Sequence, residues 1–378
     1  MRIAQIAPLF ESVPPRLYGG TERVVHYLTE ELVRQGHEVT LFASGDSITS
    51  AELVACTPRA LRLDPDVRDA VPHQMLLLDK VRQRAEDFDI LHFHVDYLHF
   101  PLFRTQAGRT LTTLHGRQDL CRPHAVLRSF PGDAAGLHLG CAARAAAAGQ
   151  FCGDRPPWAA ARSAPADVRT ARRLSRISRA HLPGERPDRA IAIARASGLP
   201  LKIAAKVDKA DERYFHEAIA PLLEGDGVEF IGEINESEKT EFLGNAVGLL
   251  FPIDWPEPFG LVMIEAMACG TPVLAFRSGS VAEIVEDGVS GRIVTSVEHA
   301  AQAIPTLLAL DRRAVRAQFE EHFSATRMAA DYVRVYQKLL RKRPAAEREL
   351  SVLAAHSAAM NGHTGHAAAA IATQHETN

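Results

Sequence analysis

The sequence predicts an α/β protein built from two doubly wound parallel sheets. With 378 residues, the chain is longer than one hydrophobic core usually serves, so two domains are expected. Short apolar runs alternate with segments of helical periodicity, first near the N-terminus and again in the second half. This alternation is typical of parallel strands connected by helices that cover both faces of a sheet.

The individual elements follow from hydrophobic periodicity. In the first unit, strands are predicted over residues 2–8, 37–43, 89–94 and 110–115, and helices over 22–35 and 75–85. In the second unit, strands are predicted over residues 201–205, 228–232, 248–251 and 272–276, and helices over 236–245 and after Phe259.

The chain divides accordingly into five parts. These are a Rossmann-like domain (1–117), an anomalous segment (118–184), a second Rossmann-like domain (185–320), a C-terminal helix (321–342) and a tail (343–378) that is expected to be disordered.

The segment 118–184 differs from its surroundings because it is crowded with Ala, Arg, Pro and Gly and contains no Lys, Glu, Tyr or Met. We expect no buried strand there, and its composition favours an Arg-rich linker. An alternative is a pair of frameshifts: residues 150–163 and 179–183, back-translated and read one base later, can give a strand and turn and the string Gly-Arg-Ile-Ser-Pro. Sequencing the gene across this interval tests the hypothesis.

Charge and cysteine content exclude several classes of protein. The net charge of -3 argues against general nucleic-acid binding, which draws most of its affinity from a basic surface. The N-terminus does not read as a signal peptide, and no apolar run is long enough to span a bilayer, although peripheral membrane contact stays open. From these two features we expect a cytoplasmic protein. The five cysteines lack paired spacing, which favours neither a disulfide framework nor a zinc site, and they are interpreted as free thiols.

The most specific signal is the stretch 256–273. Glu257 precedes a proline, which favours an extended backbone at the mouth of the sheet. Phe259 and Gly260 are expected to open a helix whose first N–H groups attract phosphate, and glycine lets an anion come close. Glu265 lies nearly two turns further on. The two carboxylates therefore flank one anion site, Glu257 suited to sugar hydroxyls and Glu265 to a ribose.

This stretch resembles the E-x7-E motif of GT-B glycosyltransferases of family 4. Further segments that resemble the family are residues 230–233, 242–246, 249–252, 278–285, 287–291, 322–324 and 332–340. The resemblance implies a GT-B fold, with two Rossmann-like domains that face each other across a cleft. It also implies that the first domain holds the acceptor and the second holds a nucleotide-sugar donor, through Phe259, Gly260, Leu261 and Glu265, with Glu257 as a catalytic residue.

In the first domain, the turn at Gly19 and Gly20 resembles the glycine pair of the family, which lets the donor phosphates or the acceptor come close; a simple tight turn is the alternative. The sequence of this turn differs from the G-x-G-x-x-G fingerprint, which weakens the case for a dinucleotide-binding oxidoreductase. His115 ends a strand and is similar to the catalytic cleft histidine of the family, whereas His94 is a candidate acceptor contact. A zinc site that includes His92 would need ligands that we cannot place.

The resemblance implies that no metal or other cofactor is needed, because the family neutralises the leaving diphosphate with an Arg and a Lys. Arg176 lies in an imperfect copy of that motif and is not assigned the role, whereas Lys206 at a strand end is a candidate donor contact. The implied reaction retains the anomeric configuration. Alternatives are an inactive relative, since the middle segment lacks the phosphate clamp, and a nucleotide-sugar epimerase. The donor, the acceptor (a small molecule or glycan) and the oligomeric state stay open.

Overall fold

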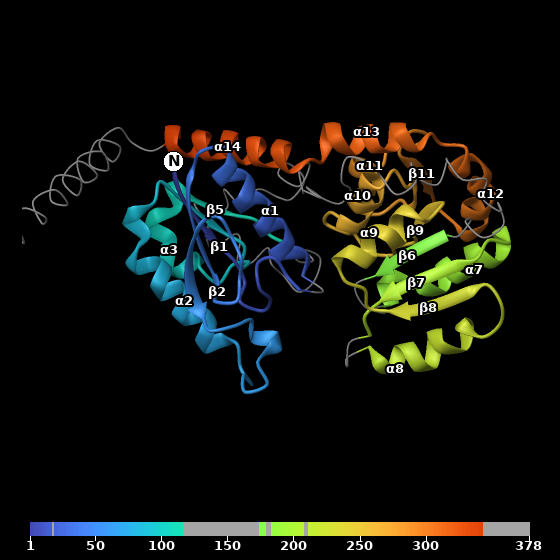
Figure 1. Cartoon of the computed structure of the whole chain (residues 1–378), viewed down its shortest axis with the longest axis horizontal. Coiled ribbons are helices and arrows are strands. Elements are labelled where there is room, and N and C mark those ends of the chain that lie inside the picture. Colours follow the sequence, from blue (N-terminus) through green and yellow to red (C-terminus); the bar gives the residue numbers. More distant parts are fainter. Residues whose placement is uncertain (17–18, 116–173, 179–182, 208–210, 343–378) are drawn as a thin grey trace, which may run out of the picture.

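The computed structural model describes residues 1–16, 19–115, 174–178, 183–207 and 211–342. Within these residues the chain forms two α/β units, each built on one parallel sheet (Figure 1). The predicted fold class, two doubly wound parallel sheets, is therefore confirmed. The boundaries assigned from the sequence to the domains and to the tail stay predictions, and most of the segment 118–184 lies outside the described residues.

The first sheet has the strand order β3-β2-β1-β4-β5, and each neighbouring pair is parallel. Its strands are β1 (Arg2–Ile6), β2 (Glu38–Ser44), β3 (Glu52–Thr57), β4 (Ile90–Phe93) and β5 (Thr110–Thr112). The helices of this unit are α1 (Gly20–Arg34), α2 (Val71–Gln83) and α3 (Phe100–Phe103). Because β1 is central, the loop that follows it opens at the middle of the sheet edge where ligands bind in such folds.

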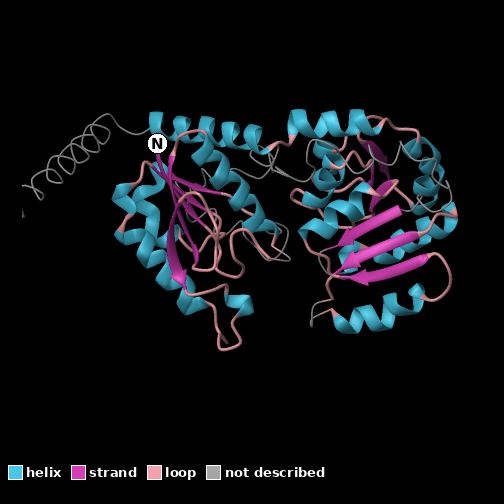
Figure 2. Cartoon of the chain, viewed as in Figure 1, coloured by secondary structure: helices cyan, strands magenta, loops and turns pink. Residues whose placement is uncertain are grey.

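The second sheet has the order β11-β10-β9-β6-β7-β8, again with parallel neighbours. Its strands are β6 (Leu174–Ser178), β7 (Leu201–Ala205), β8 (Val228–Gly232), β9 (Gly248–Phe251), β10 (Val273–Phe276) and β11 (Gly291–Val294). The helices are α7 (Pro187–Ser197), α8 (Glu212–Tyr214), α9 (Glu236–Gly244), α10 (Leu261–Ala268), α11 (Val281–Ile284), α12 (Val297–Leu308) and α13 (Arg312–His322). Figure 2 shows helices on both sides of these strands, and β9 and β10 are accordingly buried at every residue.

Strand β6 corrects one expectation from the sequence. It lies inside the segment 118–184, where we expected no buried strand, yet it is an internal strand that pairs with β7 on one side and β9 on the other. Backbone pairing with two neighbours does not require an apolar run, which is why composition missed it.

A long helix, α14 (Ala325–Lys342), joins the two units. It continues from α13 above the second unit and lies over the first (Figure 1). Met328, Tyr332 and Tyr336 are spaced by four residues, so they share one face of the helix, and all three are buried. They belong to the same apolar cluster as Leu28 and Leu32 of α1. The helix predicted to close the chain therefore packs on the first domain.

Candidate active site

Glu257 lies in the loop between β9 and α10, at the start of the most specific motif. Its Oε1 accepts hydrogen bonds from the backbone N–H of Gly260 at 3.1 Å and of Phe259 at 3.4 Å. These two amides are therefore engaged by the carboxylate, and α10 begins at Leu261, two residues later than expected. Gly260 is the N-cap, and no side chain caps the helix. Of the first-turn amides of α10, that of Met263 donates to the carbonyl of Gly260 at 3.0 Å, so those of Leu261 and Val262 remain the candidate anion contacts.

Two glycines allow this loop to close. Gly260 has φ +77°, and a Cβ there would lie 2.7 Å from Cε of Met263. Gly279 has φ +50°, and a Cβ there would lie 2.5 Å from the backbone nitrogen of Glu257. The neighbouring Ser280 donates its N–H to the carbonyl of Glu257 at 3.0 Å and its hydroxyl to the carbonyl of Phe259 at 2.9 Å. The loop before α11 thus holds the Glu257 loop in place.

Glu265, the second acid of the motif, lies just over one turn into α10. It is 5% exposed, and its Oε1 lies 2.7 Å from Nζ of Lys239 on α9. Burial of a carboxylate is costly without such a partner. Lys239 was not predicted from the sequence, because nothing in the spacing of α9 and α10 shows that the two side chains meet.

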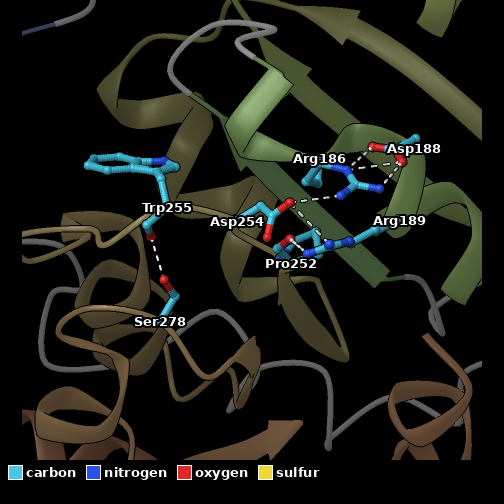
Figure 3. Close-up of polar contacts among 7 residues, drawn as sticks. All are labelled: Arg186, Asp188, Arg189, Pro252, Asp254, Trp255 and Ser278. Atoms are coloured by element: carbon cyan, nitrogen blue, oxygen red, sulfur yellow. Dashed lines mark hydrogen bonds and ion pairs between the residues drawn. The ribbon is translucent and has the colours of Figure 1, made fainter. Parts of the chain in front are cut away.

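An ion-pair network links the start of α7 to the same loop (Figure 3). Oδ2 of Asp254 lies 2.9 Å from NH1 of Arg186 and 3.1 Å from NH2 of Arg189. Arg186 adopts φ +51° and is further held by Asp188 at 2.8 Å. Trp255, the next residue after Asp254, accepts a 2.7 Å hydrogen bond from the hydroxyl of Ser278 through its carbonyl. The backbone leading into Glu257 is therefore fixed from two sides.

In the first domain, Gly19 is the N-cap of α1 and Gly20 is its first residue. A Cβ at Gly19 would lie 2.6 Å from Cβ of Pro15 and 3.1 Å from Oε2 of Glu22. The packing of the protein itself thus requires a residue without a side chain at position 19, which is what the alternative of a tight turn predicts. Burial raises the pKa of Glu22 to about 7, and the nearby carboxyl of Glu11 adds to the increase.

Lys206 follows β7 in the second domain and lies at the edge that faces the first. Burial raises the pKa of Glu11, whereas the charges of Arg62 and, from the other domain, Lys206 oppose the increase. Arg62 forms a 3.0 Å ion pair with Glu11. Lys206 is therefore close enough to the loop after β1 for its charge to act across the gap between the domains.

His115 and His94 lie together at the ends of neighbouring strands. Nε2 of His115 lies 2.8 Å from Nδ1 of His94, and Nε2 of His94 lies 2.9 Å from Oε1 of Gln5. Burial lowers the pKa of His115 to about 4 and that of His94 well below its ordinary value. Both rings are neutral at physiological pH. His115 is half-buried, whereas His94 is only 2% exposed, so His94 supports His115 rather than lining the surface.

The histidines that suggested a metal site have other partners. His92 binds the hydroxyl groups of Tyr336 and Thr113 through its two ring nitrogens, at 2.7 and 2.8 Å. His99 binds Thr112 at 2.9 Å and stacks on Phe93, with ring centroids 3.9 Å apart. These rings are structural parts of the first domain.

Two further expectations concern the whole chain. Cys56 and Cys269 are buried free thiols, whereas the other three cysteines lie outside the described residues. Among the described helices, none combines the length and apolarity needed to cross a bilayer.

Two family models match the chain. The one described as Glycosyltransferase Family 4 matches residues 18–196, and the one described as Glycosyl transferases group 1 matches residues 186–322. A D-inositol 3-phosphate glycosyltransferase of Catenulispora acidiphila is 38% identical over 85 residues, 22% of this chain and 20% of the relative. A phosphatidyl-myo-inositol mannosyltransferase of Mycobacterium leprae is 29% identical over 139 residues, 35% of this chain and 36% of the relative. The matches thus span about a fifth and about a third of these relatives.

Solved structures match over far more of the chain. A sucrose-phosphate synthase from Thermosynechococcus elongatus superposes with a TM-score of 0.66 at 19% identity, covering 91% of this chain and 100% of the other. HepE of Anabaena, solved with UDP-glucose, superposes with a TM-score of 0.64 at 15% identity, covering 90% and 99%. The glycosyltransferase AviGT4 of avilamycin A biosynthesis gives 0.62 at 22% identity, covering 91% and 99%. At these identities the likeness establishes the two-domain fold.

Proposed function

Because the chain belongs to glycosyltransferase family 4 and has the GT-B fold, we propose that it transfers a sugar from a nucleotide-sugar donor to an acceptor with retention of the anomeric configuration. The observation that carries the proposal is the pair of acids at α10. Glu257 and Glu265 flank the start of a helix that no side chain caps, and each is held in place by its own partners. Such a helix start binds phosphate, and the acids on either side suit a sugar and a ribose.

The donor half lies in the second domain. The diphosphate contacts the first-turn amides of α10, and Lys206 adds a positive charge beside it. Glu265, held by Lys239, accepts hydrogen bonds from the ribose, and Glu257 accepts them from hydroxyls of the transferred sugar. The binding of UDP-glucose by HepE supports a nucleoside diphosphate sugar as the class of donor.

The acceptor half lies in the first domain, near Gly19, Gly20 and His115. The bond between the anomeric carbon and the phosphate oxygen breaks while the acceptor oxygen approaches from the same face. The acceptor proton passes to an oxygen of the leaving diphosphate, so no carboxylate acts as a covalent nucleophile. His115 forms a hydrogen bond to the sugar as positive charge develops at the anomeric carbon.

Protein groups, rather than a metal, neutralise the leaving group in this proposal, as the family resemblance implies. The enzyme acts in the cytoplasm, and the free thiols of Cys56 and Cys269 fit a reducing compartment. Transfer that is unchanged after treatment with EDTA supports neutralisation by protein groups, and transfer that requires added Mg²⁺ or Mn²⁺ contradicts it.

The test is a panel of nucleotide sugars. Binding of the correct donor raises the melting temperature of the purified protein, and NMR of the product reports its anomeric configuration. Stabilisation is expected in the wild type and is lost in Glu265→Ala, which removes the ribose contact. Absence of any response across the panel would favour an inactive relative. Release of a free or altered sugar without an acceptor would favour an epimerase.

A further inference from the structure

A series of hydrogen bonds, buried except at its last link, connects the helix that joins the two domains to the candidate active site. It runs through seven side chains of β1, β4, α14 and the segments that follow β4 and β5, and every one of its six bonds is between 2.7 and 3.2 Å long. The members are Tyr332, Thr113, His92, Tyr336, Gln5, His94 and His115.

One arm of the series leads from Tyr336 to His115. Nε2 of Gln5 donates to the hydroxyl of Tyr336 at 3.2 Å, and Oε1 of Gln5 lies 2.9 Å from Nε2 of His94. A carbonyl oxygen only accepts, so His94 carries its proton on Nε2 and leaves Nδ1 as an acceptor. Nε2 of His115, 2.8 Å from that Nδ1, must then be the donor. His115 therefore keeps Nδ1 unprotonated.

The other arm leads away from the site. In the arrangement that also uses the proton of the Tyr336 hydroxyl, that hydroxyl accepts from Gln5 and donates to Nδ1 of His92, 2.7 Å away. Nε2 of His92 then donates to the hydroxyl of Thr113 at 2.8 Å, and Thr113 reaches Tyr332 at 2.9 Å. Each inner member donates at one contact and accepts at the other. The arm to His115 contains only an amide and imidazoles at its inner positions, so neither of its bonds beyond Gln5 can be reversed alone. The orientation of the Gln5 amide therefore sets the direction of that arm.

Burial keeps the imidazoles of the series neutral, because it lowers the pKa values of His92, His94 and His115. A neutral imidazole has one donor and one acceptor nitrogen, and this series of hydrogen bonds requires both.

We propose that Tyr336 is a positioning residue for His115: acting through Gln5 and His94, it holds the His115 ring in the single tautomer that has its proton on Nε2 and an acceptor at Nδ1. In the context of the proposed function, this tautomer lets His115 accept a hydrogen bond from a sugar hydroxyl. Without the Tyr336 hydroxyl, the amide of Gln5 loses the partner that orients it, and both tautomers of His115 become populated.

Tyr332 provides a control for Tyr336. Tyr332 lies one turn before Tyr336 on the same buried face of α14, and its hydroxyl ends the other arm. Tyr332→Phe removes a buried hydroxyl that binds Thr113, and Tyr336→Phe removes one that binds both Gln5 and His92, so Tyr336→Phe is expected to lower the melting temperature more. Only Tyr336→Phe disconnects Gln5.

The experiment is long-range ¹H–¹⁵N NMR of histidine-labelled protein, with the His115 signals assigned from the spectrum of His115→Asn. The wild type and Tyr332→Phe should show His115 protonated on Nε2 alone, whereas Tyr336→Phe should show averaged nitrogen shifts. Gln5→Met, which removes the amide but keeps the side-chain length, should reproduce the Tyr336→Phe spectrum. An unchanged His115 in Tyr336→Phe and Gln5→Met, or a wild-type His115 protonated on Nδ1, overturns the proposal.

Kinetics give a second, independent measurement once a donor is known. Tyr336→Phe should lower kcat on the order of tenfold, the scale of one buried hydrogen bond, with little change in KM for the donor. Tyr332→Phe should retain the wild-type kcat. Equal losses of kcat in the two variants would indicate a purely structural role. The NMR result needs no substrate, so failure of the proposed function leaves this test intact.

Discussion

The two halves of the candidate site are held in place by different means. In the second domain, the carboxylate of Glu257 is held locally by amides two and three residues away, and Glu265 is held by Lys239 of the preceding helix. In the first domain the side chains are neutral, and their supports come from distant parts of the chain, since Gln5 and Tyr336 are 331 residues apart. The position of Glu257 in the second domain thus depends on its own motif, whereas that of His115 in the first domain depends on the completed fold.

The largest expected effect compares how much Glu257 and His115 each contribute to kcat. Glu257→Gln should lower kcat by roughly a hundredfold or more, because a charged acceptor near the developing charge is lost. His115→Ala should lower it by only about tenfold, the scale of one hydrogen bond. Steady-state kinetics with the identified donor measures both, and the exposed Glu283→Gln serves as the control. A greater loss in His115→Ala would reverse the comparison.

The next effect tests whether the Glu257 loop depends on Gly279. Gly279→Ala should lower the free energy of unfolding by about 4 kcal/mol, because overpacking adds to the cost of a left-handed backbone. Gly288 has φ +85°, but a Cβ there would lie 4.0 Å from its nearest neighbour. Gly288→Ala should therefore cost only about 1 kcal/mol. Denaturant unfolding of the two variants distinguishes them, and equal costs would show that the close approach to Glu257 is unimportant.

A third prediction concerns the ionisation of Glu22 in the first domain. The pKa of Glu22 is raised to about 7 from 4.5, so the folded state favours the protonated acid, and stability falls as pH rises between those values. Glu22→Gln mimics the protonated acid and should gain up to roughly 3 kcal/mol relative to the wild type between pH 4.5 and pH 8. Unfolding at several pH values measures this gain. The exposed Glu212→Gln should show no such gain, and a flat difference for Glu22→Gln would contradict the shift.

The smallest effect concerns the support of Glu265. Asn235 caps α9 by accepting from the N–H of Glu238 at 3.1 Å, and α9 carries Lys239. Asn235→Ala should cost about 1 kcal/mol and should raise KM for the donor. Ser296→Ala removes the equivalent cap of α12, where Ser296 accepts from the N–H of His299 at 3.1 Å. Ser296→Ala should lower the free energy of unfolding by a similar amount without changing KM for the donor. A rise in KM in both variants would show that the effect of Asn235→Ala does not act through Lys239.

The same contrast explains what could be predicted from the sequence. Most strands of both sheets were predicted because buried parallel strands such as β9 are continuous apolar runs. Strands β3 and β11 were missed because they lie at sheet edges and carry polar residues such as Glu52 and Arg292. The helix that follows Gly260 was predicted close to its true start, since glycine and the Glu257 motif act locally.

Contacts between distant segments could not be predicted in this way. The pairing of Lys239 with Glu265 and the link from Gln5 to Tyr336 depend on how helices pack, which hydrophobic periodicity does not specify. The network of Arg186 and Asp254 gave no signal either. The roles assigned to individual site residues from the family resemblance stay predictions until a donor complex or the variants above test them.

The position of Tyr332 and Tyr336 also bears on how the protein is made. The residues they contact in β1 and β4 leave the ribosome long before α14 is synthesised, so the first domain must wait with Gln5 and His92 lacking their partners. Domains usually fold as units during synthesis, from the N-terminus onward. Here the first domain acquires its final stability only when translation has passed α14.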